Sequence, residues 1–228
     1  MLRKTQDGIS WLEFELLSEA KLNHGVFLSP LDFKEKDYDP IVNRILNIDR
    51  IVSGRQCHGK DVCLVAKVGE NPLCDALVTK EPRLGLLLRH ADCQAGIMYD
   101  PINHAVANIH SGWRGSVQNI YAETVNFMKN HFGSNPQNLL VAISPSLGPE
   151  NAEFIHYRTE LPESFLDFRI KTHHFNFWDI SRWQLTQCGI LPHHIQIAEM
   201  DTFSDKENFF SYRRDKTASR NGTIVALS

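Results

Sequence analysis

Residues 89–115, RHADCQAGIMYDPINHAVANIHSGWRG, contain two short apolar runs on either side of a turn. The runs at 95–99 and 105–109 have the length of strands, and the Asp-Pro-Ile-Asn segment between them favours a type I turn with proline in its second position. Cys93 comes just before the first predicted strand and His110 just after the second. Because loops at strand ends commonly carry the chemistry of α/β proteins, these two side chains are the first candidates for a functional site.

Further strands are predicted on both sides of this stretch. The apolar run at 84–88 lies between Pro82 and Asp92, which leaves too little room for a helix and favours a strand buried on both faces. Short apolar or alternating segments predict other strands at residues 9–17, 62–66, 75–79, 139–143, 195–198 and 223–227. We expect a polar loop over residues 29–40 and a turn-rich break over residues 69–74.

Helical periodicity is clearest over residues 116–130. The apolar side chains there recur at i, i+3, i+4, i+7, i+8 and i+11, with Ser116 as the expected N-cap and Gly133 beyond the end. Weaker patterns predict helices at 41–46, at 153–161 and from residue 180 to a stop at Gly189. With no internal repeat and no linker-like tract in 228 residues, the pattern predicts a single α/β domain over residues 1–228.

Composition narrows the classes of function. The net charge is −3 and no basic run occurs, which gives no support to nucleic-acid binding. No apolar window is long enough to span a membrane, and the N-terminus lacks the apolar core of a signal peptide. The five cysteines are odd in number and show no Cys-x-x-Cys spacing, so we expect reduced thiols in a cytoplasmic protein.

A third side chain can complete a site with Cys93 and His110. His58 stands just before a predicted strand, and the glycine after it would allow the backbone to approach a ligand closely. One cysteine and two histidines form a usual protein ligand set for catalytic zinc, in which a fourth position stays open. The spacings are long, so the fold rather than one local loop would assemble such a site.

The same residues also fit a thiol nucleophile. Cys93 would supply the thiolate, His110 or His58 the base, and Asp75 or Asp92 the group that orients the base. The spacing is compatible with either interpretation.

Three other residues are candidates for contacting a ligand. Trp113 can stack on a planar ligand or fill the core, and Gln56 precedes His58 by two positions. Arg114 can clamp an anion such as phosphate, or lie on the surface. The segment 111–115 leads into the predicted helix at 116, whose first amides would favour an anion.

Five segments of the chain, considered together, resemble the motifs of a known family. They are Gln56–Gly59, Asp75–Thr79, Ala91–Cys93, His110–Gly115 and Phe210–Asp215. They are similar, in this order, to the motifs of the YfiH-type family, which is also described as multicopper polyphenol oxidase or laccase domain proteins and includes a human laccase domain-containing protein. The resemblance extends from about His24 to Leu227.

The resemblance implies a layered α/β sandwich with a mixed sheet and zinc bound by His58, Cys93 and His110. It implies phosphorolysis of adenosine, inosine, guanosine or methylthioadenosine, with phosphate as the second substrate, and deamination of adenosine. Asp75 or Asp92 would then transfer protons. The copper of the older family description is less suited to this chain, because one Cys/His/His set cannot bind several coppers. Some members are linked to peptidoglycan editing, which keeps open a thiol hydrolase or amidase acting on a cell-wall precursor, or a zinc-binding protein without activity.

The chain departs from the family pattern in three loops. The residues after His24, positions 25–31, replace a usual Thr-Arg-Gly-Gly stretch. Residues 148–153 stand where Gly-Pro-Cys-Cys-Tyr-Glu is usual, and Asp201-Thr202 stands where Cys-Thr is usual. These departures predict an altered pocket wall around an intact set of three ligands.

Overall fold

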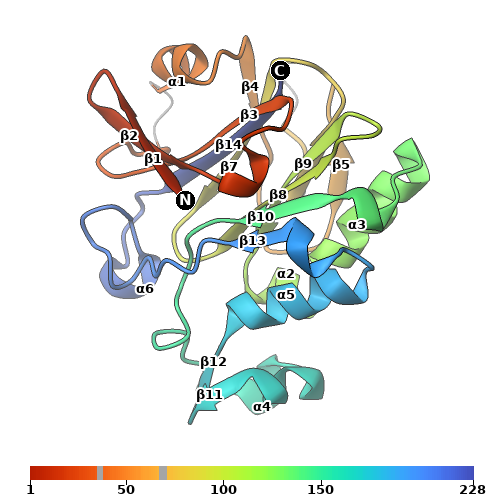
Figure 1. The fold of residues 1–228 in the computed structure, drawn as a ribbon. Coiled ribbons are helices and arrows are strands. Elements are labelled where there is room, and N and C mark those ends of the chain that lie inside the picture. Colours follow the sequence, from red (N-terminus) through yellow and green to blue (C-terminus); the bar gives the residue numbers. More distant parts are fainter. Residues whose placement is uncertain (35–37, 67–70) are drawn as a thin grey trace.

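The computed structural model describes residues 1–34, 38–66 and 71–228, and their strands form two six-stranded sheets packed face to face (Figure 1). In spatial order, the first sheet consists of β1 (Leu2–Gln6), β2 (Ile9–Glu13), β3 (Leu22–Phe27), β14 (Asn221–Leu227), β7 (Leu84–His90) and β4 (Arg50–Ser53). The second consists of β13 (Ile195–Ile197), β10 (Leu140–Ile143), β8 (Gln94–Asp100), β9 (Ala105–Ser111), β6 (Ala76–Thr79) and β5 (Val62–Leu64). A separate pair joins β11 (Arg169–Lys171) and β12 (His174–Phe175).

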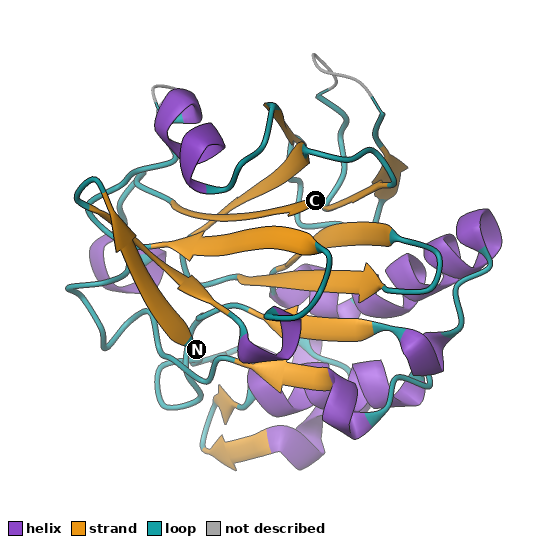
Figure 2. Cartoon of the chain, turned by 45° about the horizontal axis from the view of Figure 1, so that its top comes forward, coloured by secondary structure: helices purple, strands orange, loops and turns teal. Residues whose placement is uncertain are grey.

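Helices cover the outer faces of both sheets (Figure 2). The α-helices are α1 (Asp39–Ile45), α2 (Trp113–Val117), α3 (Ile120–Phe132), α4 (Tyr157–Glu160), α5 (Phe177–Gln187) and α6 (Tyr212–Asp215). Short 3-10 helices are η1 (Glu15–Leu17), η2 (Pro136–Asn138), η3 (Glu163–Phe168) and η4 (Pro192–His194). Helix α1 packs on the first sheet, and α3 and α5 pack on the second. Both sheets contain parallel and antiparallel pairs, so the predicted α/β sandwich with mixed sheets is confirmed. The single-domain assignment stays a prediction.

The central core follows from the alternation of side chains along the strands. Ile97 and Val106 of the hairpin β8–β9 point into the layer between the sheets, whereas their neighbours Met98 and Ala107 point toward α3. All four are fully buried. Burial of a large aliphatic side chain contributes about 1.5–3 kcal/mol, so this hairpin anchors both layers of the sandwich.

The connection between β7 and β8 passes from one sheet to the other. Strand β7 belongs to the first sheet and β8 to the second, and only residues 91–93 join them. The predicted hairpin at 95–109 is confirmed. Cys93 therefore lies where the chain crosses between the two sheets.

The predicted single helix at 116–130 is wrong, because the chain forms two helices there. Asn119 adopts a left-handed φ of 56°, and its side chain accepts a hydrogen bond from the amide of Ala122 at the start of α3. Asparagine tolerates this conformation better than most residues and caps helices well. The apolar stripe of α3 was predicted correctly, but its N-cap is Asn119 and not Ser116.

Two other predicted elements are shorter than expected. The strand predicted over 9–17 ends at Glu13, and the amide of Phe14 donates to His24 Nε2 at 2.8 Å in place of a strand partner. The helix predicted over 153–161 is limited to α4, because the Phe154 amide bonds to the His173 carbonyl. The predicted polar loop at 29–40 and the break at 69–74 lie partly outside the described residues.

No helix in the described parts of the chain is both long enough and apolar enough to cross a lipid bilayer.

Asn108 fastens the two sheets to each other. Its side chain is fully buried on β9 of the second sheet. Its amide nitrogen donates to the carbonyls of Leu86 and Thr223 in the first sheet, at 2.8 and 2.9 Å. We predict that Asn108→Ala lowers the free energy of unfolding by about 2–4 kcal/mol, because two buried hydrogen bonds are lost. Urea denaturation measures this change.

Ile102→Ala is the matched control, since its side chain is 71% exposed and its loss should change stability by less than about 0.5 kcal/mol. Equal effects of the two substitutions would contradict the role assigned to Asn108.

Candidate metal centre

Cys93 and His110 meet at one end of the second sheet because of the register of β8 and β9. Gln94 and Ser111, the two outer ends of the hairpin, pair with each other. Cys93 precedes the first of these and His110 precedes the second. His58 joins them from the loop before β5. The potential ligand atoms of the three side chains lie within 4.8 Å of one another, close enough to hold one metal ion.

The carboxylate of Asp75 connects the ligand-bearing segments. Strands β6 and β9 are antiparallel neighbours, which brings Asp75 beside His110. One carboxylate oxygen lies 2.8 Å from His110 Nδ1. The two oxygens also accept hydrogen bonds from the backbone amides of residues 57, 58 and 59, at 3.1, 2.9 and 2.8 Å. Since Nδ1 of His110 is engaged, its Nε2 remains to face a metal ion.

The three groups shift one another's protonation. Burial raises the pKa of Asp75, but hydrogen bonds from His110, Cys57 and the Gly59 amide outweigh burial and hold the pKa well below its usual range. Burial lowers the pKa of His110, whereas Asp75 and Cys93 raise it to about 9. Burial raises the pKa of Cys93, whereas His110 and His58 lower it to about 6. A thiolate at neutral pH is the form of cysteine that binds metals and also the form that acts as a nucleophile.

Two residues at the site have unusual backbone conformations. His58 has a φ of 61° and Asp92 a φ of 84°, in the left-handed region that costs non-glycine residues about 1–2 kcal/mol. Hydrogen bonds oppose this cost. The His58 amide donates to Asp75, and the Asp92 carboxylate accepts from Thr202 Oγ1 at 2.8 Å and from the Arg213 amide at 2.6 Å. Strain of this kind is common where side chains are positioned for function.

The glycines of the Gly-Trp-Arg-Gly segment provide space for the ligands. A Cβ atom on Gly112 would lie 2.9 Å from His58 Cδ2 and 3.1 Å from Cys93 Sγ. A Cβ atom on Gly115 would lie 3.0 Å from the carbonyl oxygen of Gly59. The contact with His58 is closer than Cβ atoms make, and the other two would require the neighbouring atoms to shift. Glycine at both positions therefore lets the segment pack directly against the His58 loop.

Two cavities meet at His58 and Cys93, and His110 lines the larger of the two. His58, Ala91, Cys93 and Tyr212 line both of them. The larger cavity has a volume of about 900 Å³, and we call it the basic cavity because its wall includes Lys34, Arg55, Arg89 and Arg220. The smaller has a volume of about 510 Å³, and we call it the aromatic cavity because its wall includes Trp113, Phe154 and Phe177. The basic cavity opens toward the first sheet, and the aromatic cavity toward α2 and α5.

Trp113 and Arg114 lie at the aromatic cavity. Trp113 packs edge-on against Phe154, with ring centroids 6.0 Å apart. The guanidinium carbon of the exposed Arg114 lies 4.1 Å from the centroid of the Trp113 ring, a cation–π contact. The helix at this point begins at Trp113 and has five residues. The longer helix expected to begin at 116 begins instead at Ile120, as α3, so the segment 111–115 does not lead into its N-terminus.

Gln56 and Asp92 line the cavities but are engaged with the protein. The Gln56 side chain donates to the Arg89 carbonyl at 2.8 Å and accepts from the Arg89 amide at 3.0 Å, so it behaves as an added strand partner. Both oxygens of Asp92 accept hydrogen bonds from the C-terminal part of the chain. These contacts favour a role in holding the neighbouring backbone in place, rather than in binding a ligand, for both residues.

The arginines of the basic cavity and Tyr212 were not among the candidates from the sequence. Arg89 could have been identified from the sequence, because it is a charged residue directly after the apolar run at 84–88. Arg55 and Arg220 could not have been identified in this way, since each stands in an ordinary polar segment.

Two of the three loops in which the chain is expected to depart from the family pattern meet at Asp201. Its carboxylate accepts hydrogen bonds from the Gly148 amide at 2.8 Å and from Asn151 Nδ2 at 2.6 Å. It also accepts from the Phe203 amide and from Ser204 Oγ. The loop that Asp201 holds in this way includes Ala152, which lines the aromatic cavity. Two departures from the family pattern, at 148–153 and at 201–202, are thus one connected structure.

Comparisons with known proteins agree over most of the chain. The family model described as "Multi-copper polyphenol oxidoreductase laccase" matches residues 37–228. A Bacteroides thetaiotaomicron protein named purine nucleoside phosphorylase is 31% identical over 149 residues, which cover 61% of this chain and 55% of that protein. The match therefore spans about half of that relative. The Escherichia coli protein named purine nucleoside phosphorylase YfiH is 29% identical over 181 residues, which cover 75% of this chain and 72% of that protein.

Among solved structures, that of YlmD from Geobacillus stearothermophilus has a TM-score of 0.86 at 23% identity, with 99% of this chain and 98% of that chain covered. At this identity the likeness shows the shared fold.

The Asp201 contacts predict a pH-dependent contribution to stability. Burial raises the pKa of Asp201, but hydrogen bonds from Ser204, Gly148, Phe203 and Asn151 outweigh burial and lower the pKa. A carboxyl whose pKa is lower in the folded state stabilises the fold above its unfolded pKa of about 4 and loses this effect as the pH falls through the folded value. We expect Asp201→Asn to destabilise the protein at pH 7 by about 1–3 kcal/mol, and by less below about pH 4.

Thermal unfolding of the wild type and the variant across this range measures the difference. Asp7→Asn is the control, since Asp7 is exposed and, within the described residues, its side chain forms a single surface ion pair, with Arg44. A gap between Asp201→Asn and the wild type that does not change with pH would count against this account.

Proposed function

Because the chain belongs to the family described as multi-copper polyphenol oxidoreductase laccase, we propose that it is a zinc enzyme that cleaves purine nucleosides with phosphate at His58, Cys93 and His110. The expected resemblance to YfiH-type proteins is confirmed. Two relatives in this family are named purine nucleoside phosphorylase. The observation that carries the proposal is the position of the three ligands between a basic cavity and an aromatic cavity.

The donor set fits zinc. One thiolate and two imidazoles are usual zinc ligands, and the lowered pKa of Cys93 favours the thiolate that zinc requires. His110 is held by Asp75, as the histidines of zinc sites usually are. In the described residues, this is the one group of three histidine, cysteine or acidic side chains that can hold a metal, whereas laccase chemistry needs several coppers.

When bound, zinc supplies a positive charge that polarises an oxygen of the substrate. The side chains of the two cavities position the substrates. The purine ring is placed in the aromatic cavity against Trp113, Phe154 and Phe177, because flat bases stack well on aromatic rings. The sugar then lies over the ligands, where the two cavities meet. A phosphate oxygen forms a bond to the anomeric carbon, and the carbon–nitrogen bond to the purine breaks. Its electron pair passes to the purine, which takes up a proton.

Deamination of adenosine is a second proposed activity of the same site. Zinc nucleobase deaminases hold the metal with one histidine and two cysteines or with three cysteines, a set related to this one, and an acidic residue that does not bind the metal transfers the protons. The acidic candidates here are Asp75 and Asp92, and both are engaged in hydrogen bonds within the protein. This makes phosphorolysis the primary proposal.

A thiol hydrolase or amidase acting on a cell-wall precursor is the alternative that one observation favours. Cys93 contacts His110, and His110 contacts Asp75, so the three residues can serve as nucleophile, base and the acid that orients the base. His58 adds a second imidazole whose ligand atom lies within 4.8 Å of those of Cys93 and His110. This third potential ligand favours metal binding over a thiol nucleophile.

The test combines metal analysis with a panel of nucleosides. We expect protein purified without a tag to hold about one zinc per chain. With phosphate, it should release a free purine base and a sugar 1-phosphate from adenosine, inosine, guanosine or methylthioadenosine. Cys93→Ala should remove the metal and reduce turnover by at least about 100-fold, because the site loses its anionic ligand. Cys188→Ala, outside both cavities, is the control.

A metal-free protein whose Cys93 is alkylated rapidly near neutral pH would favour the thiol hydrolase. A zinc-loaded protein that is inactive across the whole panel would favour a zinc-binding protein without this activity.

Asp75 has a testable role in holding the ligands. Asp75→Asn keeps the shape of the side chain, but removes the charge and one acceptor from the His58 loop and His110. We expect the affinity for zinc to fall by about 10–100-fold, as measured by competition with a coloured chelator. Asp7→Asn should leave the affinity unchanged. If Asp75→Asn also left it unchanged, Asp75 would not position the ligands.

A further inference from the structure

The basic cavity has a sign of charge that the protein as a whole does not have. The chain carries a net charge of −3, yet four cationic side chains line this cavity: Lys34, Arg55, Arg89 and Arg220. Among the described residues, none of those lining it is acidic. Arginines gathered in a concave wall repel one another unless an anion balances them, so the part of the cavity formed by Arg55, Arg89 and Arg220 is suited to an anionic ligand.

The register of the first sheet explains why three arginines gather here. Strand β7 lies between β14 and β4. Arg50 of β4 pairs with Leu84 of β7, so the same register places Arg55, just after β4, level with Arg89. On the other side, the first residue of β14 pairs with the last residue of β7, which places Arg220 at the same end. The three side chains therefore come together at the end of β7, immediately before the loop that carries Cys93.

Arg89 has hydrogen-bonding capacity that the protein does not use. Its guanidinium donates to Ser53 Oγ at 2.5 Å, and its backbone is held on both sides by Gln56. Its Nε is buried and has no hydrogen-bond partner among the described residues. A buried donor without a partner is costly. Arg89 lines the basic cavity, so a shift of its side chain toward a bound ligand oxygen would relieve that cost.

Arg55 and Arg220 differ in how they are held. The exposed Arg55 forms no side-chain hydrogen bond or ion pair with the parts of the chain that the structure describes. The guanidinium of Arg220 donates to the carbonyls of Thr217 and Ser219 at 3.0 and 2.8 Å, which fixes its position. A fixed guanidinium and a free one can together enclose an anion of variable size.

We propose that the basic cavity is the phosphate subsite, with Arg55 and Arg89 as the residues that bind phosphate for attack on the sugar. This inference rests on the proposed function. It places the phosphate away from Arg114, whose guanidinium is stacked on Trp113 across the ligands, in the aromatic cavity. The nucleophile and the purine leaving group then approach the sugar from different cavities, which meet at His58, Ala91, Cys93 and Tyr212.

The test measures the binding of inorganic phosphate to the zinc-loaded protein by calorimetry, without nucleoside. We expect Arg55→Gln to weaken this binding by about 10–100-fold, which corresponds to one charge-assisted hydrogen bond, and to raise the KM for phosphate by a similar factor. The KM for the nucleoside should change by less than about twofold, and Arg55→Lys should restore part of the phosphate affinity. Because the Arg55 side chain is exposed and has no hydrogen-bond partner among the described residues, its replacement should not unfold the chain.

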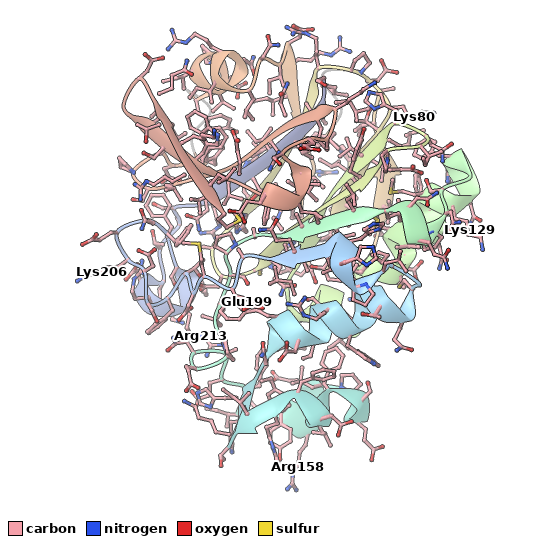
Figure 3. The ribbon with its side chains drawn as sticks, in the orientation of Figure 1. Lys80, Lys129, Arg158, Glu199, Lys206 and Arg213 are labelled. Carbon is pink, nitrogen blue, oxygen red and sulfur yellow. The ribbon has the colours of Figure 1, made fainter. Side chains whose placement is uncertain are left out.

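Arg158→Gln is the matched control. Arg158 belongs to α4 and lies at the lower tip of the molecule, outside both cavities (Figure 3). Arg114→Gln tests the competing location. Unchanged phosphate binding by Arg55→Gln, or loss of phosphate binding by Arg114→Gln alone, would overturn the proposal.

Two further results separate this inference from the proposed function. Phosphate binding that depends on Arg55, in a protein that cleaves no purine nucleoside, would support the subsite and reject the function. If the protein cleaves nucleosides and Arg55→Gln leaves the KM for phosphate unchanged, the proposed function would stand and the phosphate subsite would be rejected. A nucleoside 5′-monophosphate is the third ligand. If Arg55→Gln weakened only its binding, and not that of inorganic phosphate, the cavity would recognise a phosphorylated substrate and the proposal would be wrong.

Discussion

The buried carboxylate of Asp75 is the interaction on which the site depends. It accepts hydrogen bonds from three successive amides of the His58 loop and from His110. These bonds join a loop in a strained conformation to the end of a strand. A buried carboxylate without such partners would be costly, so the loop and the strand end are stabilised only in the arrangement that brings their imidazoles together. The thiolate of Cys93 then adds an opposite charge beside His110.

The two sheets give this site its two different sides. The Cys93 loop is the short crossing from the first sheet to the second, so each of its flanks is built by a different part of the fold. The first sheet contributes the arginines at the end of β7. Helices α2 and α5 contribute aromatic side chains. A reaction that joins a charged reactant to a flat, weakly polar one requires a site with two such sides, which is why we favour phosphorolysis over reactions of a single substrate.

The loops in which the chain departs from its family also form a coherent unit. Asp201 bonds to Gly148 and Asn151, so the two altered segments support each other. Ala152 of the first segment lines the aromatic cavity, whereas no described residue of either segment lines the basic cavity. A change in these segments would therefore alter the aromatic cavity and leave the lining of the basic cavity unchanged.

The sequence by itself determined the strands at 84–88, 95–99 and 105–109, the turn between the last two, and His58, Cys93 and His110 as a possible ligand set. These features depend on burial patterns and turn residues that are local in the chain. Tertiary structure decided that Asp75, and not Asp92, bonds to His110, and it alone formed the basic cavity. Arg55 and Arg220 meet Arg89 only because β4 and β14 both pair with β7, and strand order is set by contacts between distant residues that no local pattern records.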